Sequence, residues 1–481
     1  IDGSNQNLKT IPPEILALKE LEEVHLENNQ ISEIPQGIQH LEKIKVLYLH
    51  NNSLQNLCQE LGSLSNLESL DLSENYLESL PKEIVNQTKL REIYLKQNHF
   101  ENFPCDLCVL CNLEVIDLDD NKLKTIPEDI GHLVRLQKFY VASNHLMGLP
   151  ESLSHCRKLS VLDLTHNSIH SLPYSLEQLT ELTEVGLSGN RLEKVPRLLC
   201  NWVSLHLLYL RNTSLHGLRR SFKHLVNLRF LDLSQNHIDH FPVQICTLKD
   251  LEILALDDNK LPPAISSLSK LKILGLTGND FVSFPEEIFS LVSLEKLYIG
   301  QDQGSKLSSL PENIKKLTNL KELYIENNQL EQLPASLGLM PNLEVLDCRH
   351  NLLRQLPDAI CQTRDLRELL LEDNLLSRLP ENLDHLRLTN LSYLNLRELL
   401  LEDNLLSRLP ENLDHLVNLK VLTLTDNLME DPPMEVILCC PKLSYSVLEF
   451  IQWQRLPPVL IAPRPTWCLC LSLQSQTKAF C

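Results

Sequence analysis

The sequence of 481 residues contains little glycine and few aromatic residues. Only 13 residues are Gly, and Phe, Trp and Tyr together make up 5% of the chain. Phosphate-binding loops need several glycines at fixed spacing, and neither GxGxxG nor GxxxxGK followed by Ser or Thr occurs. The composition therefore argues against a nucleotide-binding fold, and no cofactor is expected.

Basic residues are also scarce relative to acidic ones. The chain has 44 Lys and Arg against 63 Asp and Glu, a formal net charge of −19. A protein that binds nucleic acid along its length carries the opposite balance, because it must neutralise phosphates. No nucleic acid is expected as a partner, and a protein with a basic patch is the electrostatic default.

Long apolar runs are missing as well. No run reaches the roughly 18 to 20 residues that cross a bilayer, and the stretch 456–473 is interrupted by prolines and Arg464. The first residues from Ile1 onward are acidic and polar and do not resemble a secretory signal. We expect no membrane insertion and a cytoplasmic location.

What the sequence does contain is a repeat. The unit LxxLxLxxNxL recurs eighteen times, after a leading half-unit at 8–18, and its second half reads LPxxIxxL. The register of 23 residues shortens after Asn259 and lengthens after residue 302. The Asn position of the unit is occupied by Asn29, Asn52, Asn75, Asn98, Asn121, Asn144, Asn167, Asn190, Thr213, Asn236, Asn259, Asn279, Asp302, Asn328, Asn351, Asn374, Asn404 and Asn427.

This period predicts the fold. In LxxLxL, alternate residues point to one side of a short strand, and one unit cannot cover its own apolar face. The units must therefore stack into a parallel sheet, with the Asn amide turned inward to bond backbone groups. Proline at the start of the second half favours a short helix or an extended segment on the outer side. The result is an α/β horseshoe with the sheet on its concave face, about 80 Å long for eighteen strands.

The repeat resembles the leucine-rich repeat family, and specifically its 23-residue intracellular class, which includes plant Ras-group and Ras-pathway scaffold proteins. The match covers residues 5 to about 435. The residues within the repeats and the ending Asp431-Pro432-Pro433-Met434-Glu435 further resemble the leucine-rich repeat and IQ motif-containing proteins. This resemblance implies a leucine-rich repeat solenoid and a role in intracellular protein interactions.

Two domains are expected: the solenoid over 1–435 and a non-repeat tail over 436–481 that is poorly ordered. The tail contains only the first two letters of a calmodulin-binding IQ helix, at Ile451-Gln452, and Pro457-Pro458 would end any helix there. Calmodulin binding is therefore not predicted. Within the solenoid, residues 366–386 recur identically at 396–416, either as a recent duplication or as an error of sequence assembly.

Cysteine usage and catalytic motifs point to a non-catalytic protein without a metal. Most of the 14 cysteines fall inside repeats, where a small thiol replaces an apolar residue, which favours a reducing compartment. Cys105-x-x-Cys108-x-x-Cys111 has metal-ligand spacing, but structural thiols are the favoured interpretation. Residues of a solenoid meet only their neighbours, and no nucleophile and base are brought together, so we predict that the chain is not an enzyme.

The candidate binding site is the inner face. The fifth position of each unit points outward from the concave sheet and holds six of the ten tyrosines. The third, fifth, seventh and eighth positions together hold 23 acids and five bases, a net charge of −18. Tyrosine beside acid is typical of a protein interface. The predicted contact residues are Tyr48, Asp71, Tyr94, Asp117, Asp119, Tyr140, Asp163, Tyr209, Asp232, Tyr298, Tyr324 and Asp347.

Two functions remain open from the residues alone. The first is an intracellular interaction scaffold that holds a protein partner on this acidic, tyrosine-rich face. The family resemblance implies that such a scaffold acts in signal transduction. The alternative is a regulatory subunit that docks on a phosphatase or a GTPase-pathway enzyme. An extracellular receptor module is disfavoured, because no cysteine pair caps the N-terminal end.

Overall fold

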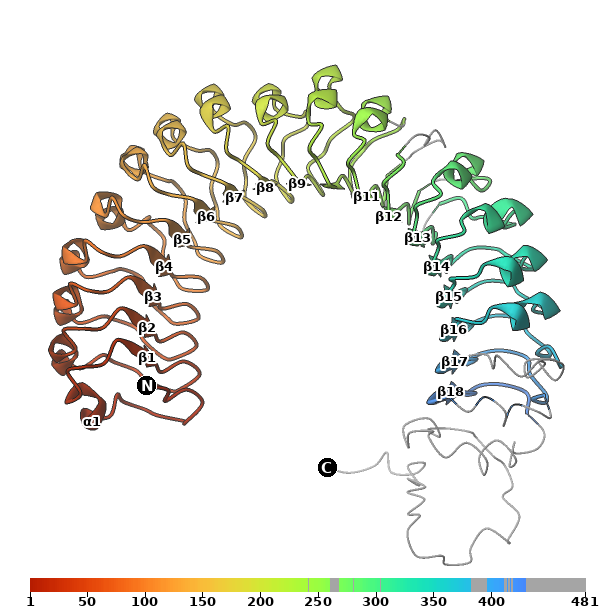
Figure 1. Ribbon diagram of the computed structural model, residues 1–481, viewed down its shortest axis with the longest axis horizontal. Coiled ribbons are helices and arrows are strands. Elements are labelled where there is room, and N and C mark those ends of the chain that lie inside the picture. The colour runs from red at the N-terminus through yellow and green to blue at the C-terminus, as the bar shows by residue number, and fades with distance from the viewer. Residues whose placement is uncertain are drawn as a thin grey trace, which may run out of the picture.

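The chain folds into an open horseshoe, with strands on the inner face and short helices on the outer face (Figure 1). The computed structural model describes residues 1–240, 242–259, 268–279, 281–302, 304–381, 396–410, 413, 416 and 418–429. The predicted tail at 436–481, with the letters Ile451-Gln452, lies outside the described residues. Among the described residues, no helix has both the length and the apolar composition to cross a membrane.

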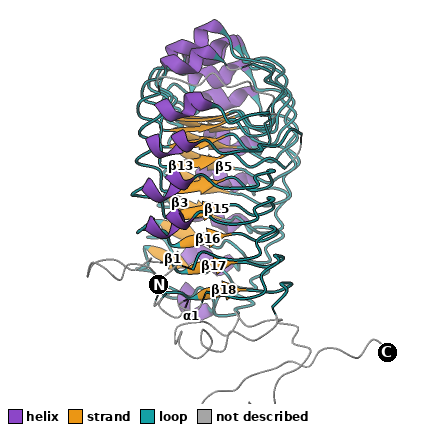
Figure 2. Ribbon diagram, turned by 90° about the vertical axis from the view of Figure 1, so that its right-hand side faces the viewer, coloured by secondary structure: helices purple, strands orange, loops and turns teal. Residues whose placement is uncertain are grey.

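Each repeat contributes one strand of three residues, and the described residues form an 18-stranded sheet. Figure 2 shows these strands stacked in a single column. The strands are β1 (Glu23–His25), β2 (Val46–Tyr48), β3 (Ser69–Asp71), β4 (Glu92–Tyr94), β5 (Val115–Asp117), β6 (Lys138–Tyr140), β7 (Val161–Asp163), β8 (Glu184–Gly186), β9 (Leu207–Tyr209), β10 (Phe230–Asp232), β11 (Ile253–Ala255), β12 (Ile273–Gly275), β13 (Lys296–Tyr298), β14 (Glu322–Tyr324), β15 (Val345–Asp347), β16 (Glu368–Leu370), β17 (Glu398–Leu400) and β18 (Val421–Thr423).

Every strand pairs in parallel with the next one along the chain, and equivalent positions of the unit face each other. The pairing survives both changes of spacing, since Ala255 lies opposite Gly275 and Tyr298 lies opposite Tyr324. The missing and added residues are therefore absorbed between strands, not within them. The predicted parallel sheet of eighteen strands is confirmed.

The outer side of the horseshoe consists of 3-10 helices of five residues, preceded near the N-terminus by α1 (Pro13–Leu16). Proline occupies the position before twelve of the fourteen such helices in the described residues, because its fixed φ suits that position. They are η1 (Gln36–His40), η2 (Gln59–Ser63), η3 (Lys82–Asn86), η4 (Cys105–Val109), η5 (Glu128–His132), η6 (Glu151–His155), η7 (Tyr174–Gln178), η8 (Arg197–Asn201), η9 (Arg220–His224), η10 (Val243–Thr247), η11 (Glu286–Ser290), η12 (Glu312–Lys316), η13 (Ala335–Leu339) and η14 (Asp358–Gln362).

The core is a continuous column of leucine and isoleucine side chains between the inner strands and the outer helices. Most of these side chains are completely buried, and Trp202 is the largest of them. Trp202 Nε1 donates a hydrogen bond of 2.9 Å to the carbonyl oxygen of Leu176 in the preceding repeat. A polar atom in the core is thus satisfied by the neighbouring repeat, because each unit alone leaves its interior open.

The predicted asparagine ladder is present. Asn121 Nδ2 lies 3.0 Å from the carbonyl oxygen of Leu95 in the preceding repeat and 3.1 Å from that of Leu118 in its own repeat. Its Oδ1 accepts a hydrogen bond of 3.1 Å from the backbone N–H of Phe100. One buried amide therefore ties two repeats together on both its donor and acceptor sides.

One position of the ladder differs from the sequence prediction. Asp302 was expected in the Asn position, but its side chain is exposed and Oδ1 accepts a 2.6 Å hydrogen bond from Asn327 Nδ2. Gln301 is instead completely buried. A carboxylate would be costly among core carbonyl oxygens, because it can only accept hydrogen bonds. Gln301 does not take over the ladder contacts, since neither its Nε2 nor its Oε1 has a hydrogen-bond partner among the described residues.

The residue before the ladder position has a left-handed backbone in seventeen of the eighteen described units. At the fifteen non-glycine positions φ lies between 50° and 57°, as at Asp120, Asp258 and Asp373. Asn, Asp and Gly tolerate this region better than other residues. Part of the acidic charge on the inner face therefore follows from backbone conformation.

The described parts of both copies of the duplicated segment continue the sheet and the ladder. β16 and β17 pair in register, and Asn404 Nδ2 donates a 2.9 Å hydrogen bond to the carbonyl oxygen of Leu371. In the next repeat, Asn427 Nδ2 donates to the Leu401 carbonyl oxygen at 2.7 Å. The ladder thus passes through the duplication without interruption.

Deleting residues 387–416 is expected to leave a folded solenoid whose unfolding midpoint is at least that of the full chain. Leu371 takes the place of Leu401 as the partner of Asn427, and the spacing from Asn374 to Asn427 falls from 53 to 23 residues. Thermal unfolding followed by circular dichroism measures the midpoint. A lower midpoint in the deletion would show that the second copy contributes stability of its own.

Candidate functional site

The predicted contact residues come together as one row along the concave sheet. The strand register places Tyr48 opposite Asp71, Asp71 opposite Tyr94, and Tyr94 opposite Asp117. The alternation continues through Tyr140 and Asp163, and resumes with Tyr209 beside Asp232. Asp119 lies two residues beyond Asp117, at the end of the same repeat's strand. Parallel pairing in register is the reason for this arrangement, because it stacks equal positions of successive units.

The tyrosines of the row are half-buried and partly held by their neighbours. Tyr298 and Tyr324 stack with ring centroids 4.5 Å apart and planes inclined by 7°. The Tyr324 hydroxyl donates a 3.1 Å hydrogen bond to Glu322 Oε2. Burial, followed by the charge of Glu92, raises the pKa of Tyr94, so this phenol stays neutral. These rings give rigid contact area with a polar end.

The aspartates of the row also have a structural role. In each of Asp71, Asp117, Asp163 and Asp232, Oδ1 accepts a hydrogen bond of 2.9 to 3.0 Å from the backbone N–H two residues later. This contact caps the point at which the chain leaves the strand. In Asp71 the second carboxylate oxygen, Oδ2, also lies 3.0 Å from His50 Nδ1.

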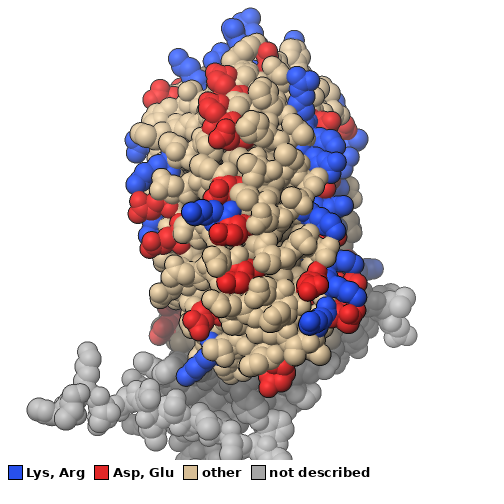
Figure 3. Space-filling view, turned by 90° about the vertical axis from the view of Figure 1, so that its left-hand side faces the viewer, with Lys and Arg blue, Asp and Glu red and all other residues tan. Residues whose placement is uncertain are grey.

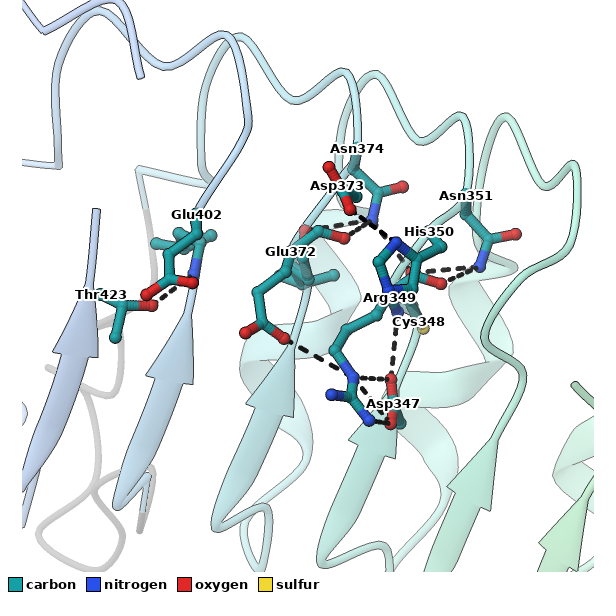
Figure 4. Close-up of polar contacts among 12 residues, drawn as sticks. Asp347, Cys348, Arg349, His350, Asn351, Glu372, Asp373, Asn374, Glu402 and Thr423 are labelled. Atoms are coloured by element: carbon teal, nitrogen blue, oxygen red, sulfur yellow. Dashed lines mark hydrogen bonds and ion pairs between the residues drawn. The ribbon is translucent and has the colours of Figure 1, made fainter. Parts of the chain in front are cut away.

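Asp347 differs from the other aspartates of the row. Its side chain is 1% exposed, and Arg349 holds it with Nε at 3.0 Å and Nη2 at 2.7 Å (Figure 4). The same guanidinium lies 3.5 Å from Glu372 Oε2. Asp347 is thus covered by an ion pair, and Arg349, at 39% exposure, is the group that a partner would meet.

Two acids of β5 and the turn after it repel each other. Burial first, and then the charge of Asp117, raises the pKa of Asp119 to about 7. Burial also raises the pKa of Asp117. Asp119 Oδ1 accepts a 2.6 Å hydrogen bond from the Ala142 N–H of the next repeat, which offsets part of this cost. The inner face is therefore poor in countercharge at this point.

Asp119→Asn is expected to raise the free energy of unfolding, relative to wild type, more at pH 8 than at pH 4.5. A carboxyl whose pKa is raised in the folded state contributes stability that is lost as pH rises from about 4 toward 7, and the amide does not titrate. Urea unfolding at the two pH values measures the difference. Asp106→Asn on the outer helix η4 is the control, and an equal difference between Asp119→Asn and wild type at both pH values would contradict the argument.

Some residues of the inner face were not among the predicted contacts. Asp257 Oδ1 accepts a 2.7 Å hydrogen bond from the Thr277 N–H, and a Cβ on Gly275 would meet Asp257 Oδ2 at 2.4 Å. Asp163 covers Gly186 in the same way, since a Cβ there would lie 2.2 Å from Asp163 Oδ1. Carboxylates thus fill the space over the two glycines of the row. The seventh position of the unit is the sequence signal that could have identified Asp257.

No metal site is found in the part of the chain that the structure describes. Cys105 and Cys111 are exposed, whereas Cys108 is buried, and burial raises the pKa of the Cys108 thiol to about 12. A thiol with so high a pKa binds metal poorly. The nine cysteines among the described residues form no disulfide.

The outer face has a different character. Seen from the left-hand side of Figure 1, acidic side chains run down the middle of the face, and acidic and basic side chains are mixed along both of its edges (Figure 3). Opposite charges also pair between repeats beside the sheet, as in Lys45 with Glu22 at 2.6 Å and Lys272 with Glu252 at 2.6 Å. Of the formal net charge of −19, the third, fifth, seventh and eighth positions of the units carry −18.

Comparison with known proteins supports the description of the repeats. The model of a leucine-rich repeat region matches residues 197–399, and models of single leucine-rich repeats match 3–54, 42–100, 112–133 and 149–192. A segment of 33 residues is 91% identical to leucine-rich repeat and IQ domain-containing protein 4 of Mus musculus. That match spans 7% of this chain and 6% of the length of the curated relative.

Solved structures of the same fold are similar over most of the chain. A leucine-rich repeat protein of Leptospira interrogans, LIC12759, is 31% identical, with a TM-score of 0.58, covering 85% of this chain and 90% of its own. The plant peptide hormone receptor RGFR1, solved in complex with RGF2, is 26% identical with a TM-score of 0.61. This match covers 87% of the present chain and 72% of the receptor chain. Repeat, ladder, sheet and relatives agree: the chain belongs to the leucine-rich repeat family.

Proposed function

We propose that the protein is a non-enzymatic, cytoplasmic interaction scaffold that holds a protein partner on its concave face. The observation that carries the proposal is the in-register row of tyrosine and aspartate from Tyr48 to Asp163. It offers rigid aromatic surface, and a negative charge that is not balanced within the face. The partner would present a basic patch, and a role in signal transduction fits such a scaffold.

Two further observations support this proposal. Leucine-rich repeats generally act as protein interaction modules, and the structurally similar receptor RGFR1 is solved with RGF2 bound. The lack of disulfides among the nine cysteines of the described residues suits a reducing compartment.

Salt and substitutions on the row test the proposal. With a partner isolated by pull-down on the full chain, association should slow steeply as salt rises, because the Debye length falls to about 8 Å at physiological ionic strength. Asp117→Lys with Asp119→Lys should mainly lower the association rate. Tyr94→Ala or Tyr140→Ala should mainly raise the dissociation rate, since tyrosine contacts form after encounter. Surface plasmon resonance separates the two rates.

The matched control makes the same charge change on the outer face. Asp106→Lys with Asp129→Lys alters η4 and η5, where both side chains are exposed. This control should leave both rates within about twofold of wild type. Unchanged binding after all four concave substitutions would instead direct attention away from the concave face.

A further inference from the structure

The two identical repeats at the C-terminal end build a surface that occurs nowhere else among the described strands. β16 and β17 pair in register, so Glu368 lies opposite Glu398 and Leu370 lies opposite Leu400. Glu372 and Glu402 follow at the seventh position of the two units. We call these six residues the leucine–glutamate platform. Its half-buried leucines occupy the row that elsewhere holds mainly tyrosine and aspartate.

Charge on the platform is left without balance. From β15 to β18 the third, fifth, seventh and eighth positions hold eight acids and a single Lys or Arg, Arg349. Because the two repeats are identical, like charges face each other across neighbouring strands, which is unfavourable. Burial first, and then Glu398, raises the pKa of Glu368. Burial and Glu402 raise the pKa of Glu372 against the opposing effect of Arg349.

One carboxylate oxygen shows this lack of balance directly. Glu372 Oε2 is buried and has no hydrogen-bond donor among the described residues, and Arg349 Nε approaches it only to 3.5 Å. Arg349 itself is committed to Asp347, as Figure 4 shows. On the other flank, Arg367 pairs with Glu344 at 2.9 Å, beside the sheet. A cationic group from outside would therefore gain contacts that the chain does not supply.

The spacing of the rows suits a helix. Position three begins the strand and position seven lies two residues beyond its end, so the two are at most about 14 Å apart, with position five between them. An α-helix with its side chains is about 10 to 12 Å in diameter. A helix laid along the leucines could therefore rest its apolar side on Leu370 and Leu400, while lysines or arginines on both flanks reach the two glutamate rows.

We propose that the leucine–glutamate platform binds a basic amphipathic helix of a partner protein. The proposal rests on the proposed function, since it assigns partner chemistry to one section of the same concave face. Leu370 and Leu400 provide the apolar contact, and the four glutamates select Lys or Arg on either side. Helix-in-groove recognition of this kind reads apolar residues at helical spacing.

A designed peptide tests the proposal on the full chain. The probe is a fluorescent 14-residue peptide of leucine and lysine with its leucines on one helical face, and the comparison peptide has the same composition with the leucines spread around the helix. Fluorescence anisotropy should show binding of the amphipathic peptide at least about tenfold tighter than that of its isomer. Equal affinities for the two peptides would show that charge attraction alone causes binding, and would overturn the proposal. Absence of binding at peptide concentrations up to about 1 mM would also overturn it.

Substitutions then locate the binding. Leu370→Thr with Leu400→Thr, and separately Glu372→Gln with Glu402→Gln, should each weaken binding of the amphipathic peptide by about tenfold or more. Threonine is compatible with this position, because Thr423 occupies it in β18, and circular dichroism checks that the variants remain folded. The control, Glu23→Gln with Glu74→Gln, removes two charges at the other end of the face and should change affinity by less than about twofold.

The outcomes are distinct from those of the first proposal. Unchanged peptide affinity in the leucine variant, or an equal loss in the control, would overturn the platform as a helix site. Neither result affects the test of the tyrosine–aspartate row, which uses a captured partner and substitutions on β4 to β6. Conversely, if the substitutions in the tyrosine–aspartate row leave partner binding unchanged, the peptide experiment still tests the platform independently.

Discussion

Asn144→Ala is expected to lower the free energy of unfolding by about 1 to 3 kcal/mol. Asn144 Nδ2 donates to the carbonyl oxygens of Leu118 at 2.9 Å and Ala142 at 3.0 Å, and Oδ1 accepts from the Leu123 N–H at 2.9 Å. The alanine variant leaves the buried Leu123 N–H without its acceptor. It also removes one of the two donors to each of the Leu118 and Ala142 carbonyl oxygens, which keep Asn121 Nδ2 and the Asp120 N–H. Chemical denaturation followed by circular dichroism measures the loss.

Two further variants frame this result. Asn201→Ala removes an exposed asparagine from η8, whose amide bonds only to Glu177, and should change stability by no more than about 0.5 kcal/mol. Thr213→Asn is the converse change, because Thr213 bonds the Leu210 carbonyl oxygen but has no amide oxygen to offer the preceding repeat. It should be neutral or stabilising. Equal unfolding midpoints for Asn144→Ala and wild type would remove the ladder as a source of stability.

Gly338→Ala is expected to be destabilising by about 2 to 3 kcal/mol, since it forces two repeats apart. A Cβ on Gly338 in η13 would lie 2.1 Å from the backbone carbonyl oxygen of Ala359 in η14. No side-chain rotation relieves a contact with backbone, so the outer helices must separate. Thermal unfolding monitored by circular dichroism measures the effect.

The matched control is a glycine in open space. A Cβ on Gly148 meets no atom within 4 Å, so Gly148→Ala should be neutral or slightly stabilising, because alanine has less freedom to lose on folding. Close packing of η13 on η14 predicts opposite signs for the two substitutions. If both variants melted at the temperature of the wild type, the tight approach of these helices would not be a determinant of stability.

The repeat period by itself determined the architecture of this protein. Leucines at alternate positions define which side of each strand is buried, and a constant spacing stacks equal positions, so the parallel sheet and the tyrosine–aspartate row follow without knowledge of any contact. The inward asparagine was predictable for the same reason, since a polar residue at a core position must bond the backbone.

Tertiary structure decided how the individual side chains are used. Asp347 and Asp117 occupy the same position of the repeat and both follow Leu-Glu-Val and one apolar residue. Only Asp347 is covered, because the guanidinium of Arg349, two residues later, bonds to it. Gln301 is buried in place of Asp302, since the cost of a buried carboxylate outweighs the register of the repeat. The close approach at Gly338 depends on how two outer helices settle against each other. These outcomes depend on distances between neighbouring repeats, which a one-dimensional pattern does not contain.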